Sequence, residues 1–376
     1  MATPQALALH AGPAALAHLR RHGLAPAHVR AIAAAAGGPK GLILNGLDRH
    51  LFGHWLWGDG PTLHLAGASI GAWRMAAACL PDGGSPARAQ AAMAEMAERY
   101  IDARYDPPPG ETLRAHHVSA RYAGLLRDQL GGHEAALLAH PRRRLHVVTS
   151  RGRLLLHRER RFWTAAGFGA AFLSNLAHRR GLGLWLERVL FSDRREPLPI
   201  DLTDLPTRRV DLTVDNLLGS VLASGSIPFW LDAVHDLPGA PRGAYWDGGI
   251  TDYHLHWPWS HWPAPDDRQA SGPLVLVPHV QASLVPGWLD KALRARHRPT
   301  PWLDNVLLLS PTPAWIATLP NGKLPDRTDF QGLSVAQRQR DWRIAVQRSQ
   351  QLADEFDDWL ASGAPVERVA PLGAVA

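Results

Sequence analysis

The stretch PTLHLAGASIGAWRMAAACL (residues 61–80) decides the fold. Its first seven residues form an apolar run typical of a buried strand, and the residues after Ser69 have helical composition. Between them lies a G-x-S-x-G match, Gly67-Ala68-Ser69-Ile70-Gly71. A serine on a sharp strand-to-helix turn holds its hydroxyl beyond the edge of a sheet, and flanking glycines let neighbouring backbone approach closely. The sequence therefore predicts Ser69 as a catalytic nucleophile, with Gly67 and Gly71 supporting its turn.

A similar unit precedes this one in the chain. Residues 28–36, HVRAIAAAA, form an apolar run that ends at Gly37-Gly38, and Pro39 suits the first turn of a helix through GLILNGLDRHLF (41–52). Two successive strand–glycine–helix units predict an α/β fold with a mostly parallel central sheet covered by helices.

The rest of the chain extends this arrangement. Short apolar runs at 273–279 and 305–311 are typical of central strands. The segment 334–361 predicts a long amphipathic C-terminal helix, ended by Gly363. No segment looks like a linker between independent halves, so we expect one domain over 1–376, with its motif-bearing core at about 28–311.

The glycine turn at Gly37-Gly38-Pro39-Lys40-Gly41 is a candidate oxyanion site. Fixed backbone N–H groups at a helix N-terminus can stabilise the negative oxygen of an acyl-transfer intermediate. Because Pro39 has no N–H, this role would fall to Gly37 and Gly38. A plain glycine-rich connection would look the same, and the spacing is not that of a P-loop.

Asp247-Gly248-Gly249 follows the apolar segment GAYW. An aspartate at a strand end, followed by two glycines, can approach another loop closely. If Asp247 reaches Ser69, its carboxylate can accept the hydroxyl proton. A pKa near 3.9 makes an ordinary aspartate a weak base, so positioning and oxyanion donors would supply most of the rate.

Together these elements resemble the patatin-like phospholipases. That family carries a glycine-rich oxyanion loop, a G-x-S-x-G serine and a D-G-[GA] aspartate in this order, with an alanine- and serine-rich segment ending in proline before the aspartate, which residues 222–229 (LASGSIPF) resemble. The resemblance implies a three-layer α/β fold with helices on both faces of the sheet. It also implies a Ser69–Asp247 dyad without histidine and hydrolysis of acyl ester bonds in lipids, as in phospholipases A and esterases.

Two positions depart from the family pattern. The family's loop begins Asp-Gly-Gly-Gly and carries arginine, whereas this chain has Ala35-Ala36-Gly37-Gly38 with Lys40. Lysine keeps the charge but lacks the planar fork of arginine. Where the family often has asparagine after the D-G-G element, this chain has Asp252.

Two other enzymatic interpretations fit the same residues. In a Ser–Asp–His hydrolase, His279 would be the base, since it directly follows the apolar run 273–278. An acyltransferase would use the same Ser69–Asp247 dyad, with an acceptor alcohol in place of water.

A third alternative is a non-catalytic protein of a lipid surface. The chain has 15 tryptophans, and Trp257, Trp259 and Trp262 cluster beside prolines. Trp163, Phe168, Phe172 and Trp185 lie among basic residues. Such aromatics suit a lipid interface, but more often they belong to the core, which is the interpretation we favour.

The composition limits the kinds of cross-link and partner that we expect for this protein. The single cysteine, Cys79, excludes an intramolecular disulfide and predicts a buried thiol. The net charge is +6, but the arginine runs 142–144, 160–161 and 194–195 accompany no nucleic-acid motif, so we expect a solvated basic face and no nucleic-acid partner.

The histidines show no tight ligand cluster in the sequence, and we expect neither metal nor cofactor. The substrate is expected to be a lipid or another acyl ester. No signal-peptide pattern precedes the apolar N-terminal stretch, so the expected location is cytoplasmic, with peripheral contact to membranes as an open alternative. We make no prediction of oligomeric state.

Overall fold

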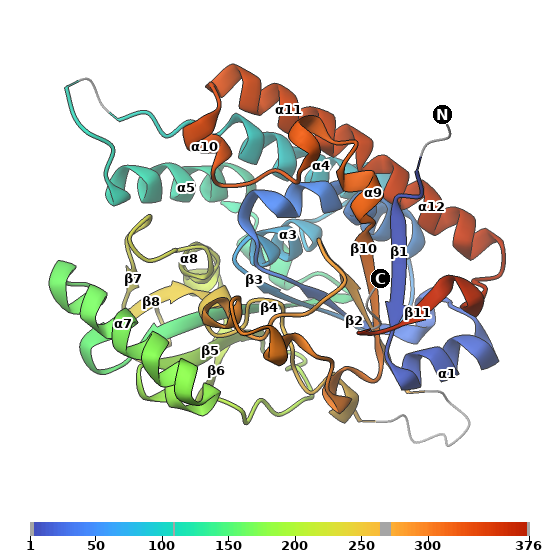
Figure 1. Ribbon diagram of the computed structural model, residues 1–376, viewed down its shortest axis with the longest axis horizontal. Helices are drawn as coiled ribbons and strands as arrows, with labels where there is room; N and C mark the ends of the chain where they lie inside the picture. The colour runs from blue at the N-terminus through green and yellow to red at the C-terminus, as the bar shows by residue number, and fades with distance from the viewer. Residues whose placement is uncertain (1–3, 108–109, 264–271, 374–376) are drawn as a thin grey trace.

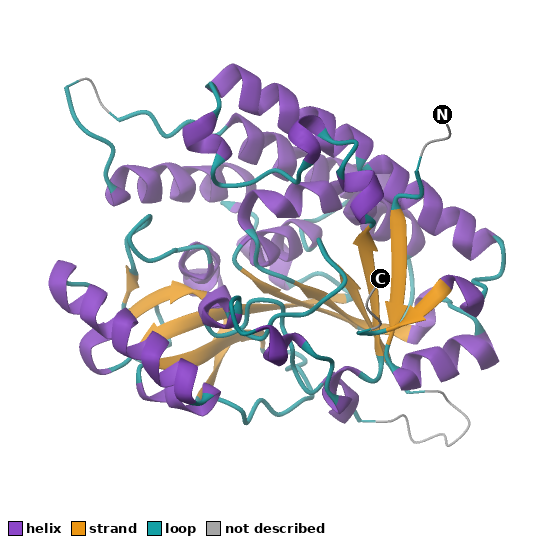
Figure 2. Ribbon diagram, in the orientation of Figure 1, coloured by secondary structure: helices purple, strands orange, loops and turns teal. Residues whose placement is uncertain are grey.

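A central sheet organises the protein in the computed structural model, which describes residues 4–107, 110–263 and 272–373 (Figures 1 and 2). Nine strands follow the order β11-β1-β10-β9-β2-β3-β4-β5-β6, and β8 pairs with β4 and with β7. The strands are β1 (Leu7–Ala11), β2 (Val29–Ala34), β3 (Leu63–Ala68), β4 (Arg143–Gly152), β5 (Leu186–Asp193), β6 (Thr207–Leu212), β7 (Val234–His235), β8 (Ala244–Asp247), β9 (Leu274–Pro278), β10 (Val306–Pro311) and β11 (Val369–Pro371).

The predicted α/β class with a mostly parallel sheet is confirmed. Neighbouring strands from β10 through β9, β2 and β3 to β4 are all parallel, as are β5 with β6 and β1 with β11. Antiparallel pairs join β1 to β10, β4 to β5 and β8, and β7 to β8. Because the eleven strands in the described part of the chain join one sheet, we propose that the chain folds as one domain.

Helices surround the sheet, most of them over one face (Figure 2). Leucine, isoleucine and valine side chains of the central strands pack there against α2, α3, α4, α5, α8 and α12. Cys79 belongs to this core, as predicted, and burial raises the pKa of its thiol to about 12. The helices are α1 (Pro13–His22), α2 (Asn45–His50), α3 (Ile70–Ala78), α4 (Pro86–Asp102), α5 (Ala115–Leu130), α6 (Glu134–Leu138), α7 (Arg161–Ala177), α8 (Val214–Ser224), α9 (Pro313–Ile316), α10 (Asp329–Gly332), α11 (Val335–Arg348) and α12 (Gln350–Ala361).

On the opposite face of the sheet, strands β2 and β3 carry small side chains. Ala31, Ala33, Ala66 and Ala68 point to this face, where the indole rings of Trp257 and Trp259 pack with them in one core cluster. Small strand residues leave room for these large rings. Both tryptophans are fully buried, so the core interpretation is confirmed for them. Residues 264–271, which follow these tryptophans in the chain, lie outside the described residues.

Three local expectations differ from the structure. The predicted helix over 41–52 is a 3₁₀ segment, η2 (Gly38–Leu44), followed by α2 and a π-helical segment, η3 (Leu51–Trp55). The C-terminal helix is two helices, α11 and α12, which meet at Ser349, where the Ser349 hydroxyl accepts the Gly46 N–H at 3.0 Å. The glycine-broken stretch 167–191 has a composition that predicts irregular helices, but its last part belongs to strand β5, which is buried along its whole length.

The arginine run 142–144 is not a solvated face. Arg142 and Arg143 are buried, and their guanidinium groups donate to main-chain carbonyls of Leu56 and Phe52 at 2.6 and 2.9 Å. These arginines satisfy carbonyl groups at the end of η3, which explains why they are inside. Among the described residues, no helix combines the length and apolar character that crossing a bilayer requires.

Candidate active site

Ser69 lies in the tight turn between β3 and α3. Its backbone has φ 56° and ψ −126°, a conformation that side-chain-bearing residues rarely adopt. The glycines on either side are required by contact. A Cβ on Gly67 would lie 2.5 Å from the carbonyl carbon of Gly71, and one on Gly71 would lie 2.0 Å from the Ala34 oxygen in β2. The sequence therefore forms this turn because only glycine fits on both sides of it.

The side chains of Ser69 and Asp247 meet. The Ser69 hydroxyl donates a 2.7 Å hydrogen bond to Oδ2 of Asp247, although 178 positions separate them in the chain. Both residues are buried. The structure thus brings together the two residues that the sequence predicted as nucleophile and base.

Ser224 stabilises the turn at Ser69 through two hydrogen bonds. Its hydroxyl accepts the backbone N–H of Ser69 at 2.9 Å and donates to the Val148 carbonyl in β4 at 2.6 Å. Ser224 is fully buried at the end of α8. The sequence analysis flagged the segment 222–229 through its family resemblance, but it did not assign Ser224 this positioning role.

Asp247 ends β8, which pairs with β4. Its Oδ1 accepts the Gly249 N–H at 2.7 Å, so each carboxylate oxygen has a donor. A Cβ on Gly248 would lie 2.1 Å from the Val148 oxygen, and one on Gly249 would lie 2.7 Å from Cβ of Ala36. Burial raises the pKa of Asp247 above its usual range, against opposing effects from the Ser69 hydrogen bond and the charge of Arg327. A raised pKa makes this carboxylate a stronger base than an exposed aspartate.

The predicted oxyanion loop lies beside Ser69. Gly37 precedes η2, and Gly38, with a left-handed φ of 57°, begins it. Gly38 lines the same cavity as Ser69 and Ile70, the first residue of α3. The first N–H groups of a helical segment have no intrahelical acceptor. Two such segments, η2 and α3, therefore begin at this cavity.

Lys40 and Gly41 support the loop from behind it. A Cβ on Gly41 would lie 3.1 Å from the side chain of Ile70, so this glycine allows η2 to pack closely on α3. The ammonium of Lys40 lies 3.6 Å from the Asp326 carboxylate. Lys40 thus pairs with the segment before α10.

Two cations that the sequence did not single out flank the site. The Arg327 guanidinium would lie 3.2 Å from a Cβ on Gly38, so it covers the glycine turn. The Lys291 ammonium lies 4.1 Å from the ring centre of Tyr253. Both charges lower the pKa of Asp247. No local pattern marks these residues, because their segments approach the site only in the folded chain.

An apolar passage leads away from Ser69. A cavity of about 60 Å³ is lined by Ser69 and Gly38, with a larger one of about 260 Å³ beside it. The two share the side chains of Tyr100, Tyr105, Val118, Ile227 and Leu231, and the larger one extends to Trp230, Phe330 and Arg327. This lining is suited to an extended apolar group that ends at the hydroxyl of Ser69.

His279 does not complete a triad. Its Nδ1 lies 2.7 Å from the Gln281 carbonyl, and no hydrogen bond joins it to Ser69 or Asp247 in the described part of the chain. Asp252, the other departure from the family pattern, forms a buried ion pair with Arg188 at 2.6 Å and accepts the Trp257 indole N–H. Asp252 therefore has a structural partner set of its own.

Comparisons with known proteins give a distant likeness of fold. No known family model matches the sequence, and no curated protein does. Among solved structures, human GIVD cytosolic phospholipase A2 is similar with a TM-score of 0.44 and 14% identity. The match covers 97% of this chain and 66% of that one.

The strain at Ser69 can be measured by comparing two substitutions. At φ 56°, we expect Ser69→Gly to be more stable than Ser69→Ala by about 1 kcal/mol, because glycine relieves the left-handed backbone while both lose the hydroxyl. Urea unfolding of both variants gives the difference. The same pair at Ser220, inside helix α8, is the control and should show the reverse order. Greater stability of the alanine variant at position 69 would contradict the strain.

Proposed function

We propose that this protein is a patatin-like serine acyl hydrolase that cleaves carboxylic ester bonds of lipid-type substrates. The observation that carries the proposal is the 2.7 Å hydrogen bond from the Ser69 hydroxyl to Asp247, at the inner end of an apolar cavity. A buried serine that donates directly to a carboxylate has its general base already in place. The strained turn around it is typical of nucleophile elbows.

The reaction would proceed in two halves. As Ser69 Oγ attacks the ester carbonyl, its proton passes to Asp247, and the carbonyl oxygen becomes an oxyanion facing the N–H groups of Gly37 and Gly38. The alcohol leaves with the proton from Asp247, and the acyl group stays on Ser69. Asp247 then takes a proton from water, whose oxygen attacks the acyl-enzyme carbonyl. The bond from the acyl carbon to Ser69 Oγ breaks, Asp247 returns the proton to Oγ, and the fatty acid leaves.

The exposed face of α7 supports the proposal that the substrate is presented at a lipid interface. Helices of soluble proteins normally bury their large apolar residues. In α7 the buried residues are small or polar, namely Thr164, Gly167, Ala171 and Asn175. Five large apolar residues are exposed, whereas Phe168 is half-buried. Phe162 is 72% and Leu173 65% exposed, with Trp163, Phe172 and Leu176 on the same helix.

This surface continues toward the cavity. Phe168 of α7 packs on Phe229 at 5.8 Å between ring centres, and the neighbouring Trp230 lines the larger cavity. Arg160 and Arg161, at the start of α7, are exposed and would suit anionic headgroups. We propose that the exposed face of α7, with Phe229 and Trp230, rests on a lipid surface while the ester enters the larger cavity beside Trp230.

The dyad is tested by labelling and turnover. We expect Ser69→Ala and Asp247→Asn each to lower hydrolysis of nitrophenyl esters by about 10⁴-fold or more, because either change removes the activated hydroxyl. A fluorophosphonate probe should label the wild type and not Ser69→Ala. His279→Asn is the matched variant and should keep near-normal turnover. Equal hydrolysis by wild type and Ser69→Ala, with the fold intact by circular dichroism, would refute the proposal.

The pH profile tests the base. Asp247 must be ionised to accept the proton, so kcat/KM should fall with falling pH through a pKa above the ordinary aspartate value. Because the charge of Arg327 lowers this pKa, Arg327→Gln should move the acidic limb to higher pH. Arg298→Gln, at an exposed arginine, serves as the control. An acidic limb unmoved by Arg327→Gln would argue against Asp247 as the titrating group.

The lipid surface is tested with vesicles. We expect Phe162→Glu with Leu173→Glu to weaken binding to vesicles containing anionic lipid at least about tenfold, since burying each side chain is worth about 1.5–3 kcal/mol. Turnover of a short soluble ester should not change. Val214→Glu, at an exposed apolar residue of α8, is the control. Unchanged vesicle binding by the α7 variant in a sedimentation assay would exclude this face.

A further inference from the structure

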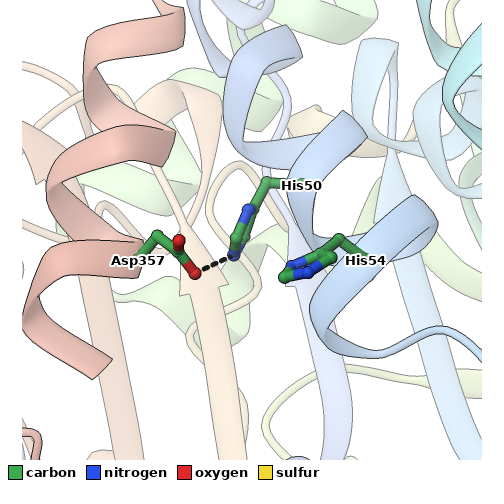
Figure 3. A group of neighbouring side chains, drawn as sticks. All are labelled: His50, His54 and Asp357. Carbon is green, nitrogen blue, oxygen red and sulfur yellow. Dashed lines mark ion pairs between the residues drawn. The ribbon is translucent and has the colours of Figure 1, made fainter. Parts of the chain in front are cut away.

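Three side chains able to bind a metal ion converge where α2 and η3 meet α12 (Figure 3). His50 ends α2, His54 lies four residues later in the π-helical segment η3, and Asp357 projects from α12. Nε2 of His50 lies 3.7 Å from Oδ1 of Asp357. One ligand atom from each of the three residues lies within 4.8 Å of the other two.

His50 is the anchor of this cluster. Its side chain is only 11% exposed, and Nε2 has no hydrogen-bond partner among the residues that the structure describes. Buried polar atoms are rarely left without a partner. Phe356 packs edge-on against the ring at 5.9 Å and limits its rotation.

The geometry needs only a small adjustment to bind an ion. In a tetrahedral site with bonds of about 2.1 Å, ligand atoms lie roughly 3.4 Å apart. His54 and Asp357 are exposed and can close the remaining distance, while His50 stays fixed. Asp354, one turn before Asp357 on α12, adds a second negative charge near His50.

We propose that His50, His54 and Asp357 bind a divalent first-row transition metal ion such as Zn²⁺, with water completing its coordination. Two imidazoles and one carboxylate suit Zn²⁺, Co²⁺ or Ni²⁺ rather than Ca²⁺ or Mg²⁺, which prefer oxygen ligands. The ion would join the helical segment that begins at the glycine turn of the active site to α12 near the C-terminus.

A second group, Glu111, His116 and His117, provides an internal comparison. Nε2 of His117 already pairs with Glu111 at 3.1 Å, and the two histidines are adjacent in the chain. No buried ligand atom without a partner belongs to this group among the described residues. This second group therefore serves as a comparison for weak metal binding by surface side chains.

The test is calorimetric titration of Zn²⁺ into the full-length protein after treatment with EDTA. We expect one site, whose affinity falls by about 100-fold or more in His54→Ala and in Asp357→Asn, because each removes a direct ligand and loss of an outer partner alone costs 10–100-fold. His54 and Asp357 are both exposed, so neither change should disturb the core. Zn²⁺ should also raise the melting temperature of the wild type and not that of His54→Ala.

His116→Ala with His117→Ala is the matched control and should bind Zn²⁺ as the wild type does. His133→Ala, at an exposed histidine elsewhere, controls for surface imidazoles in general. The proposal is overturned if the wild type binds no Zn²⁺, if His54→Ala binds it unchanged, or if only the His116 and His117 changes remove binding. None of these outcomes depends on the activity of Ser69.

Discussion

The buried carboxylate of Asp247 constrains the rest of the structure. An unpaired charge inside a protein is unstable unless hydrogen bonds replace its hydration. The Ser69 hydroxyl and the Gly249 N–H each donate to one oxygen of Asp247. These donors reach it only if β8 pairs with β4 and if Gly248 lies against the Val148 carbonyl. The pairing of β8 with β4 and the glycines after Asp247 thus provide the contacts that this buried carboxylate needs.

A strained serine needs support from parts of the chain that a local motif does not contain. The turn at Ser69 is held by Ser224 on α8, and α3 behind it is joined to α2 by the buried Arg74–Asp48 pair at 2.7 Å. Breaking such a pair leaves one charge buried without its partner, which costs about 3–5 kcal/mol. The position of Ser69 therefore depends on α2 and α8 as well as on β3.

The sequence could predict what depends on close contact within one short segment. Gly67, Gly71 and Gly248 were found because a Cβ at any of them would collide with backbone, a requirement written into the motif itself. Arg327, Lys291 and Ser224 were missed, since what they contact is decided by strands far away in the chain. The break at Ser349 depends on Gly46 in the same way, 303 positions away. The group of His50, His54 and Asp357 was missed as well, because two histidines four residues apart are not a ligand set by themselves and Asp357 joins them only through the packing of α12 on α2.

Aromatic content gave the weakest prediction, and α7 shows why. The number of tryptophans cannot distinguish a buried one from an exposed one. Trp259 packs against alanines of β2 and β3, whereas Trp163 is exposed. The difference lies in which other residues of the same segment are buried. The buried stripe of α7 consists of Thr164, Gly167, Ala171 and Asn175, so packing alone would not favour large apolar groups on its outer face. Exposed apolar surface of this kind is costly in water and becomes stabilising only against an apolar partner. In the hydrolase that we propose, whose larger cavity is lined by Trp230 next to this surface, the exposed face of α7 would bring a water-insoluble ester to Ser69.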